Sequence, residues 1–309
     1  MMHNTQPVKI IFMGTPEFAV PSLEILLHHN MHVVAVITAP DKPQGRGQKI
    51  VCPPVKESAV RFNIPVLQPT NLKAPDFLDQ LKRYEADLQI VVAFRMLPEV
   101  VWNMPPLGTF NLHASLLPLY RGAAPINWAI INGEKETGVT TFFLKHDIDT
   151  GSIIFQEKEP IHDDDDAGTL YERLMARGSR LVLRTVQAIQ GGKYETVPQP
   201  EGATKHAPKI FKETCAIKWD QGGEDIRNFV RGLSPYPAAW TMIGGKTFKV
   251  FKVSIIPKEN NGQKPGEWLT DNKKYLYFKT RDGWISVDEL QPEGKKRLPV
   301  AEFLRGNTF

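Results

Sequence analysis

The sequence is poor in cysteine and has no long hydrophobic run. Of its 309 residues only Cys52 and Cys215 are cysteines, they lie far apart, and no CxxC pair occurs. We therefore expect neither a disulfide framework nor a structural zinc site, and a reducing compartment such as the cytoplasm fits. No run of about 18 apolar residues is present, so no membrane span is expected. The opening MMHNTQPVKIIFMG also lacks the pattern of a secretory signal.

The chain has little net charge, but the charge that it has is unevenly distributed. The net charge is +4, with 41% hydrophobic and 23% charged residues, as in ordinary globular proteins. Residues 205–309 carry 19 basic and 12 acidic side chains, a net charge of +7, whereas residues 1–204 carry 19 and 22, a net charge of −3. This asymmetry fits a polyanionic partner bound mainly at one end, although a solvated lysine-rich surface would look the same.

Alternating strand and helix patterns dominate the first 190 residues. Buried strands are predicted at 8–14, 31–38, 86–94 and 108–115, with two later strands at 138–145 and 152–160. Helical patterns lie between the first three of these strands. This alternation predicts an α/β fold with a mostly parallel, doubly wound sheet. A long helix follows Asp163–Asp166, whose charges suit the positive end of the helix dipole better than a metal site.

The last third of the chain has a different pattern. Residues 191–208 are rich in glycine and proline and are predicted to be a linker between a catalytic domain, 1–190, and a C-terminal domain, 209–309. The C-terminal domain shows short strands around one helix. The strand TFKVFKV (247–253) alternates apolar and basic residues, so one face should lie inward and a cationic face outward. A small β-barrel of the OB type, which can bind nucleic acid, is expected.

Asn111 and His113 stand two residues apart on a predicted strand, so their side chains share one face. They precede Ser115 at the carboxyl end of that strand, where doubly wound sheets bind ligands. An amide donor beside an imidazole can hold an oxyanion and move a proton. A capping asparagine and a histidine satisfied within the core are the structural alternative.

The segment HDIDTG (146–151) follows another predicted strand and offers carboxylates to His113. Asp149 near that imidazole would orient it and stabilise its cation. An Asn, His and Asp set without an activated nucleophile favours direct acyl transfer, because Ser115 is not in a G-x-S-x-G elbow. A metal site formed by His113, His146 and Asp149 lacks diagnostic spacing and is disfavoured.

Two further segments bear on the ligand. GTPEF (14–18), after the first strand, is not a GxGxxG fingerprint, which weakens a dinucleotide interpretation. The insertion APDKPQGRGQKIVCPP (39–54) brings together Lys42, Arg46 and Lys49 between glycines. A basic loop of this kind suits a phosphate-bearing substrate, although a solvated loop is equally compatible with the composition.

The segment FNLHASLLPLYRGAAPINWAI (110–130), followed by ETGVT and DIDTG, resembles the 10-formyltetrahydrofolate-dependent formyltransferases. GTPEF, DKPQGRGQKI, IKWD and GLSPYPAAW narrow this resemblance to members that formylate an aminoacyl-tRNA, and it extends over essentially the whole chain. It implies a Rossmann-like formyltransferase domain, a C-terminal OB-like barrel that helps to hold tRNA, 10-formyltetrahydrofolate as formyl donor, and the α-amine of initiator methionyl-tRNA as acceptor. No metal is implied, and we expect a monomer.

The resemblance also implies roles for residues of this sequence. The catalytic set corresponds to Asn111, His113 and Asp149. The folate-binding residues correspond to Ser115, Leu116, Leu117 and Pro118, together with Phe94, Met96 and Leu97. The tRNA-acceptor loop corresponds to Lys42, Arg46 and Lys49.

Three rival functions are compatible with parts of the pattern. A formyltransferase acting on a sugar-nucleotide amine or a purine precursor, or a formyl-folate hydrolase, would share the catalytic strand. A non-catalytic RNA-binding module is disfavoured by the complete Asn, His and Asp set. A nicotinamide oxidoreductase is disfavoured by the missing glycine fingerprint.

Overall fold

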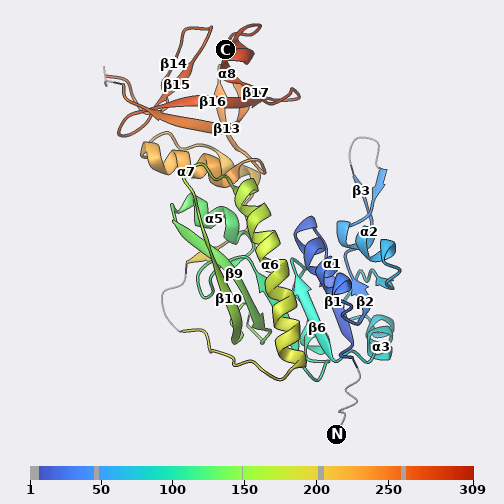
Figure 1. Cartoon of the computed structure of the whole chain (residues 1–309). Helices are drawn as coiled ribbons and strands as arrows, with labels where there is room; N and C mark the ends of the chain where they lie inside the picture. Colours follow the sequence, from blue (N-terminus) through green and yellow to red (C-terminus); the bar gives the residue numbers. More distant parts are fainter. Residues whose placement is uncertain (1–6, 45–48, 148, 201–204, 259–261) are drawn as a thin grey trace. The chain divides into compact units, whose positions relative to one another are not determined.

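The structure is a computed structural model that describes residues 7–44, 49–147, 149–200, 205–258 and 262–309 (Figure 1). The chain divides into two compact units. Unit 1 comprises 1–121, 138–159 and 172–205, and unit 2 comprises 122–137, 160–171 and 206–309. Among the helices of the described residues, none has the length and hydrophobicity needed to cross a bilayer.

Unit 1 is built on a seven-stranded sheet, as the alternating pattern predicts. Its spatial order is β10 (Ile153–Pro160), β9 (Glu136–Phe143), β7 (Thr109–His113), β6 (Leu88–Val92), β1 (Ile10–Gly14), β2 (Val33–Ile37) and β5 (Val66–Leu67). The strands from β7 to β5 pair in parallel, whereas β9 runs antiparallel to β7. The predicted α/β class with a mostly parallel sheet is therefore confirmed.

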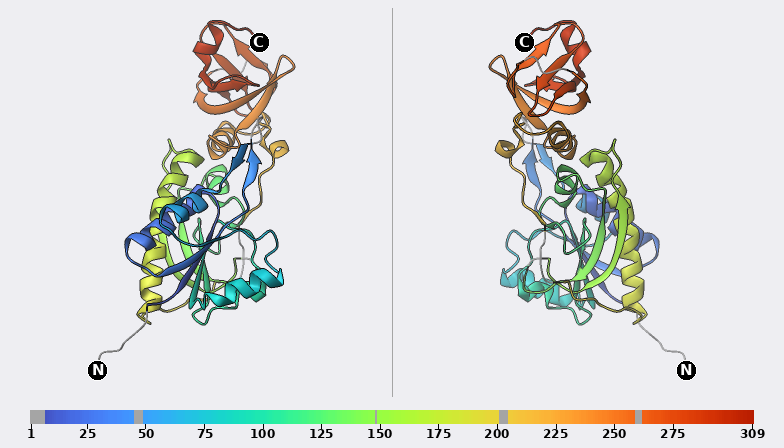
Figure 2. Two further views of the ribbon diagram at one scale, coloured as in Figure 1. Left: turned by 90° about the vertical axis from the view of Figure 1, so that its right-hand side faces the viewer. Right: turned by 90° about the vertical axis from the view of Figure 1, so that its left-hand side faces the viewer.

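Helices cover both faces of this sheet, α6 on one side and α3 on the other (Figure 2). The helices that contribute to unit 1 are η1 (Glu17–Ala19), α1 (Val20–His28), α2 (Pro54–Arg61), α3 (Pro75–Arg83), α4 (Glu99–Trp102) and α6 (Ala167–Gln190). On the α3 side, Ile11, Met13 and Val91 pack with Phe77 and Leu81 of α3. Burial of these side chains is the main force that holds the layers together.

The α6 side of the sheet is held by a close approach at Gly178. A Cβ at Gly178 would lie 2.7 Å from Cδ2 of Leu112, so a larger residue at this point of α6 would force the buried leucine of β7 to shift. Thr141 of β9 and Thr185 of α6 also exchange a hydrogen bond of 2.9 Å. The face of β7 that carries Leu112 is therefore covered by α6, and its other face is directed away from this helix.

Unit 2 contains an antiparallel sheet with the order β12 (Ala239–Ile243), β13 (Lys246–Ile256), β16 (Trp284–Pro292), β15 (Leu276–Lys279) and β14 (Trp268–Thr270), and β17 (Leu298–Pro299) pairs with β16. Its helices are α5 (Pro125–Ile131), η2 (Lys212–Cys215), α7 (Gly223–Leu233) and α8 (Val300–Leu304). Two further pairs of short strands are described: β8 (Arg121–Gly122) with β11 (His206–Ala207), and β3 (Lys42–Gln44) with β4 (Lys49–Val51).

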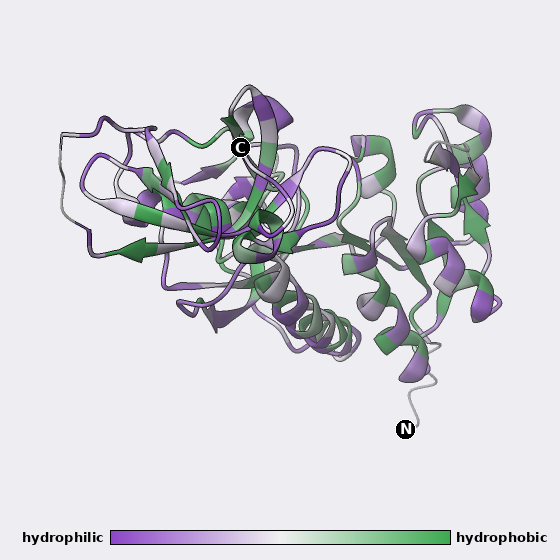
Figure 3. Ribbon diagram, turned by 90° about the horizontal axis from the view of Figure 1, so that it is seen from above, coloured by the Kyte–Doolittle hydropathy of each residue, from purple (hydrophilic) through white to green (hydrophobic). Residues whose placement is uncertain are grey.

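Strand β13 exposes both of its predicted basic residues, but not by simple alternation, because Lys249 and Lys252 lie three residues apart and share a face only through an irregularity between them. Phe248 and Val250 are buried in the core of unit 2, whereas Lys249 and Lys252 are exposed. The register shifts between Val250 and Lys252. In Figure 3, which colours each residue by its hydropathy, green hydrophobic and purple hydrophilic segments alternate along the ribbon. The cationic outer face of this strand is confirmed.

The acidic run Asp163–Asp166 lies at the start of α6, as predicted. Asp166 Oδ1 accepts a hydrogen bond of 2.9 Å from the backbone N–H of Thr169, and the Thr169 hydroxyl accepts one of 3.1 Å from the N–H of Asp166. This reciprocal pair satisfies backbone donors that the first helical turn leaves without partners. The run therefore stabilises the beginning of the helix.

A buried carboxylate joins β10 to α6. Glu159 is 5% exposed and accepts hydrogen bonds from Nε of Arg173 at 2.8 Å and Nε of Arg177 at 2.6 Å. Burial by itself would raise the pKa of Glu159, but the hydrogen bonds and charges of the two arginines outweigh it and hold this pKa below its ordinary value. The ion pair therefore stabilises the folded state while Glu159 is ionised.

We predict that Glu159→Gln lowers the free energy of unfolding at neutral pH by about 2–3 kcal/mol, since two arginines lose their counter-charge while remaining partly solvated. Because the pKa of Glu159 is lower in the folded than in the unfolded state, its contribution is complete above about pH 4.3 and is lost as the pH falls through the folded-state pKa. Urea unfolding from pH 7 to pH 3 should show the difference between wild type and variant shrinking. Glu157→Gln is the matched control, because Glu157 contacts arginines only at 3.6 and 3.7 Å. An equal loss in both variants would contradict the assignment.

Candidate active site

The register of β7 directs Asn111 and His113 to the face opposite α6. Asn111 pairs with Val91 of β6, whose side chain belongs to the core on the α3 side, and with Phe142 of β9. His113 pairs with Thr140 of β9. Since side chains alternate along a strand, Asn111 and His113 share the α3 side, as the sequence predicts.

The two polar groups differ in their hydrogen bonding. The side chain of Asn111 is half-buried and has no hydrogen-bond partner in the described part of the chain. His113 is 7% exposed, and its Nε2 lies 2.8 Å from the carbonyl oxygen of Tyr120. A carbonyl oxygen only accepts, so His113 Nε2 must donate. This leaves Nδ1 as the nitrogen that can take up or release a proton.

The turn that follows β7 is fastened to the two strands beside it. The hydroxyl of Thr140 donates to the carbonyl of Ser115 at 2.6 Å and accepts from the backbone N–H of Leu117 at 3.2 Å. Gln156 Nε2 donates to the Leu117 carbonyl and to the Thr140 hydroxyl, both at 2.9 Å. The backbone of this turn is therefore fixed before any ligand binds.

Within the turn, the four residues with a predicted folate contact have different environments. Ser115 and Leu117 are buried, whereas Leu116 and Pro118 are half-buried. The hydroxyl of Ser115 donates to the carbonyl of Leu119 at 2.6 Å. This buried hydroxyl therefore stabilises the turn.

The segment after β6 contains the other three residues with a predicted folate contact. Leu97 is buried in the core on the α3 side, Phe94 packs against that core, and Met96 is 75% exposed. Arg95 donates to the backbone carbonyls of Thr70, at 2.9 Å, and Pro69. Arg95 therefore joins the segment after β6 to the segment after β5.

Asp149 lies in the turn between β9 and β10. Because β9 is antiparallel to β7, this turn begins beside the start of β7, where the N–H of Leu144 donates to the Thr109 carbonyl at 2.8 Å. His146 in the same turn is highly exposed and faces Glu99 at 3.7 Å. In the part of the chain that the structure describes, no three His, Cys, Asp or Glu side chains gather as metal ligands would.

Three residues near the site have an unusual backbone conformation. Ala93 after β6, Tyr120 after β7 and Asp149 after β9 have φ values of 46°, 59° and 54°. The left-handed region is unfavourable for residues with a Cβ, and it persists only where the surroundings enforce it. Such positions concentrate at functional sites, and these three lie in the three segments that carry the predicted site residues.

The basic insertion forms a hairpin of β3 (Lys42–Gln44) and β4 (Lys49–Val51). Lys42 is exposed, Lys49 lies on β4, and Arg46 lies outside the described residues. Asp41 anchors the base of the hairpin, with Oδ2 at 2.6 Å from Lys56 Nζ and Oδ1 at 2.7 Å from Gln68 Nε2.

These contacts have electrostatic consequences at the base of the hairpin. Hydrogen bonds from Lys56 and then from Gln68 lower the pKa of Asp41, and the hydrogen bond to Asp41 raises the pKa of Lys56. Both groups therefore stay charged across the physiological range, and their ion pair holds Asp41, directly before β3, against Lys56 of α2.

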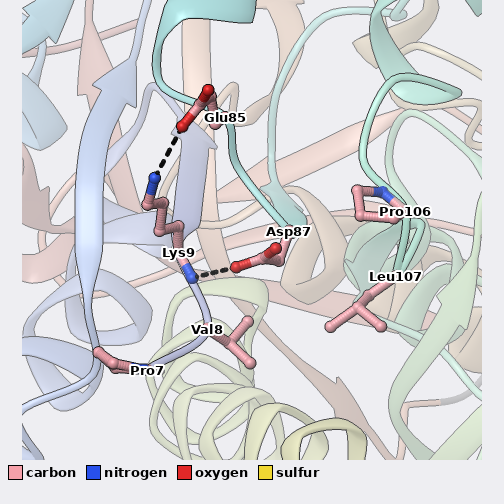
Figure 4. A pocket seen from close by; sticks show the side chains of 7 residues that line it. All are labelled: Pro7, Val8, Lys9, Glu85, Asp87, Pro106 and Leu107. Atoms are coloured by element: carbon pink, nitrogen blue, oxygen red, sulfur yellow. Dashed lines mark hydrogen bonds and ion pairs between the residues drawn. The ribbon is translucent and has the colours of Figure 1, made fainter. Parts of the chain in front are cut away.

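A surface hollow of about 410 Å³ lies at the amino ends of the strands of unit 1, on residues such as Lys9 and Leu107 (Figure 4). Lys9 already binds carboxylates there, through Nζ to Glu85 at 3.1 Å and through its backbone N–H to Asp87 at 2.8 Å. A second hollow in unit 2 is lined by Asp163–Asp166 and residues of α7 and β13. Neither hollow is lined by Asn111, His113 or Asp149.

Sequence reasoning missed the residues that support the site. Thr140, Gln156 and Gln199 are polar residues in strands or in the expected linker, and their partners lie far away in the sequence. The only signal in the sequence is the presence of a polar side chain within an otherwise apolar strand, as at Thr140.

Comparison with family models gives two matches that together cover most of the chain. Residues 8–186 match the formyl transferase family, and residues 209–308 match the formyl transferase C-terminal domain. The methionyl-tRNA formyltransferase of Bacteroides fragilis is 53% identical over 310 residues, covering 97% of this chain and 95% of its own. That of Flavobacterium johnsoniae is 51% identical and covers 98% of both chains.

Solved structures share the fold at lower identity. The N-formyltransferase of Helicobacter canadensis, in complex with folinic acid and dTDP-3-aminofucose, has a TM-score of 0.68 at 23% identity and covers 92% of this chain and 99% of its own. HypX of Aquifex aeolicus, in complex with tetrahydrofolic acid, has a TM-score of 0.64 at 21% identity and covers 97% of this chain. The present chain spans about half of HypX, 47% of its length.

We predict that neutral His113 is the tautomer with hydrogen on Nε2, because the Tyr120 carbonyl needs a donor there. Two-dimensional ¹⁵N NMR of the imidazole ring at high pH should show a protonated Nε2 and an unprotonated Nδ1. A neutral ring protonated on Nδ1 would contradict the geometry. His32, which is exposed, provides an internal reference in the same spectrum.

Proposed function

This chain belongs to the formyl transferase family, and we propose that it transfers the formyl group of 10-formyltetrahydrofolate to the α-amine of initiator methionyl-tRNA. The product is N-formylmethionyl-tRNA, which serves translation initiation. The observation that carries this function is the identity of about half of all residues with methionyl-tRNA formyltransferases over almost the entire length of both chains. The matches to both formyl transferase domains agree with it.

We propose that Asn111 and His113 stabilise the charge that develops during transfer. As the amine nitrogen bonds to the formyl carbon, the formyl oxygen gains negative charge. The carboxamide of Asn111 would donate to this oxygen, and protonated His113 would donate from Nδ1. The support is the shared face of the two side chains, the unpartnered amide of Asn111 and the occupied Nε2 of His113.

Asp149 is proposed to assist the transfer of a proton from the amine to N10 of the folate. The α-amine has a pKa of about 7.7–8.0 and must be neutral to attack. The amine loses a proton as the carbon–nitrogen bond forms, and N10 of the folate gains one as its bond to the formyl carbon breaks. Asp149 would stabilise the cation of His113 and assist this transfer, directly or through water.

The proposed folate edge is the turn Ser115–Pro118 with Phe94, Met96 and Leu97. Its fit is supported by the fixed backbone of the turn and by the half-buried side chains of Leu116 and Pro118. Met96 adds an exposed, adaptable apolar side chain. Leu97 is buried, so its side chain would pack under the residues that contact the ligand.

The proposed tRNA contacts come from two basic regions. Lys42, Arg46 and Lys49 would meet the acceptor end, and the C-terminal domain, 209–309, would bind the tRNA body through its cationic strand face. The catalytic domain is proposed to extend over 1–190 and the linker over 191–208. We further propose that the enzyme acts as a monomer in the cytoplasm.

The test is transfer from radiolabelled 10-formyltetrahydrofolate to methionyl-tRNA, uncharged tRNA, free methionine and an amino sugar nucleotide. Label should appear only on methionyl-tRNA. Transfer to the sugar nucleotide instead, or to none of the acceptors, would overturn the proposal. In the same assay, His113→Ala should lower kcat by about 10²–10³, and it should cost transition-state stabilisation more than folding stability. His32→Ala, at an exposed histidine, is the matched control and should keep the wild-type kcat.

Replacement of one hairpin lysine should weaken tRNA binding without affecting chemistry. Lys42→Ala should raise KM for methionyl-tRNA and reduce the slope of log K against log salt by about 0.7–0.9, as expected when one phosphate contact is lost. kcat and KM for the folate should not change. Lys82→Ala, at an exposed lysine of α3, should leave both the KM and the salt slope as in wild type. Equal slopes for wild type and Lys42→Ala would contradict a phosphate contact.

A further inference from the structure

Arg121 and Gln199 form a polar connection to the backbone of the Asp149 turn. Arg121 donates to Gln199 Oε1 from Nε at 3.1 Å and from Nη2 at 2.6 Å. Gln199 Nε2 in turn donates to the backbone carbonyls of Asp149, at 2.7 Å, and Gly151, at 2.8 Å. All four residues belong to unit 1. We call this set the Arg121–Gln199 brace.

The hydrogen bonds of the brace determine the orientation of the Gln199 amide. A guanidinium only donates and backbone carbonyls only accept, so the amide oxygen must face Arg121 and the NH₂ group must face the turn. Both hydrogens and both lone pairs of the amide are thereby used. The positive charge of Arg121 strengthens the bonds to the amide oxygen.

The position of Gln199 along the chain is also fixed. Val197 and Ile153 of β10 exchange two backbone hydrogen bonds of 2.8 and 2.9 Å, which hold the segment two residues before Gln199. Pro198 and Pro200 flank Gln199 and restrict the backbone on both sides. A segment expected to be only a linker thus places one side chain at the site.

The turn that receives these bonds requires support. Asp149 has a φ of 54°, in a region that residues with a Cβ rarely occupy. A Cβ at Gly151 would lie 1.5 Å from the carbonyl oxygen of Phe143, so the turn is also pressed against β9. Two hydrogen bonds from one amide to carbonyls on both sides of Thr150 favour this conformation over relaxed alternatives.

The Arg121–Gln199 brace is also connected to His113, the proposed catalytic histidine. Arg121 directly follows Tyr120, whose carbonyl accepts the Nε2 hydrogen bond of His113. One short chain of residues therefore joins the orientation of His113 to the backbone of Asp149. We propose that Gln199 is a positioning residue, oriented by Arg121, that holds the Asp149 turn in the conformation needed for transfer. This inference rests on the role proposed for Asp149.

The experiment compares Gln199→Ala, Gln199→Glu and Arg121→Ala with Glu195→Ala, an exposed neighbour on the same segment that serves as control. Gln199→Glu keeps an acceptor for Arg121 but places a carboxylate against two carbonyls. Both Gln199 variants should lower kcat by about ten- to a hundredfold, with both KM values within about twofold of wild type. Arg121→Ala should lower kcat less than the Gln199 variants do, and Arg121→Lys should retain part of the kcat that Arg121→Ala loses. The double variant of Arg121→Ala and Gln199→Ala should have nearly the same kcat as Gln199→Ala alone.

Hydrogen exchange provides a readout that does not depend on activity. In Gln199→Ala the backbone amides of the β9–β10 turn should exchange faster, while those of β7 and α6 keep their protection. Unchanged exchange in the turn would overturn the brace. Faster exchange with an unchanged kcat would overturn its positioning role. Asp149→Asn is assayed in parallel. A wild-type kcat in this variant would refute the proposed role of Asp149 and therefore also the positioning role of Gln199. The hydrogen-exchange result would still decide whether the brace itself exists.

Discussion

The antiparallel pairing of β9 with β7 is the constraint on which the rest of the candidate site depends. It places Thr140 opposite His113, where its hydroxyl can hold both the Ser115 carbonyl and the Leu117 N–H. The same pairing places the start of the β9–β10 turn beside the beginning of β7, where the Leu144 N–H donates to the Thr109 carbonyl. A parallel β9 would give neither arrangement, since its register and its turn would lie elsewhere.

Around this pairing polar side chains hold the backbone of turns. Thr140 is fully buried, and a buried polar group is costly unless it is hydrogen-bonded, a requirement that its bond to the Ser115 carbonyl meets. Gln156, which is exposed, and Gln199, which is half-buried, also bind backbone carbonyls of turns and thereby fix these segments. Residues with positive φ, such as Tyr120 and Asp149, are retained next to these contacts. Their backbone conformation is imposed by the surroundings and not by their own preference.

The sequence predicts those features that depend on local periodicity. The apolar runs locate β1, β2, β6 and β7, the period of two places Asn111 and His113 on one face, and TFKVFKV indicates the buried and cationic faces of β13. It does not predict the direction of β9, because a buried strand has the same composition in either direction. Contacts such as Gln199 to Asp149 join residues 50 apart and depend on register and on the path of the chain, for which local composition has no signal.

The environment of His113 explains why the position of a carboxylate matters for the proposed chemistry. A nearly buried imidazole that carries charge during transfer needs acceptors for both N–H groups. The Tyr120 carbonyl supplies one of these at Nε2, which leaves Nδ1 to find the second. A carbonyl is a dipole and compensates a full positive charge only in part, so a carboxylate near the ring would stabilise the cation more strongly. In the mechanism that we propose, the Asp149 turn would provide this charge only while its backbone stays in place, so that mechanism needs a hydrogen-bonded support for the turn such as Gln199 gives it.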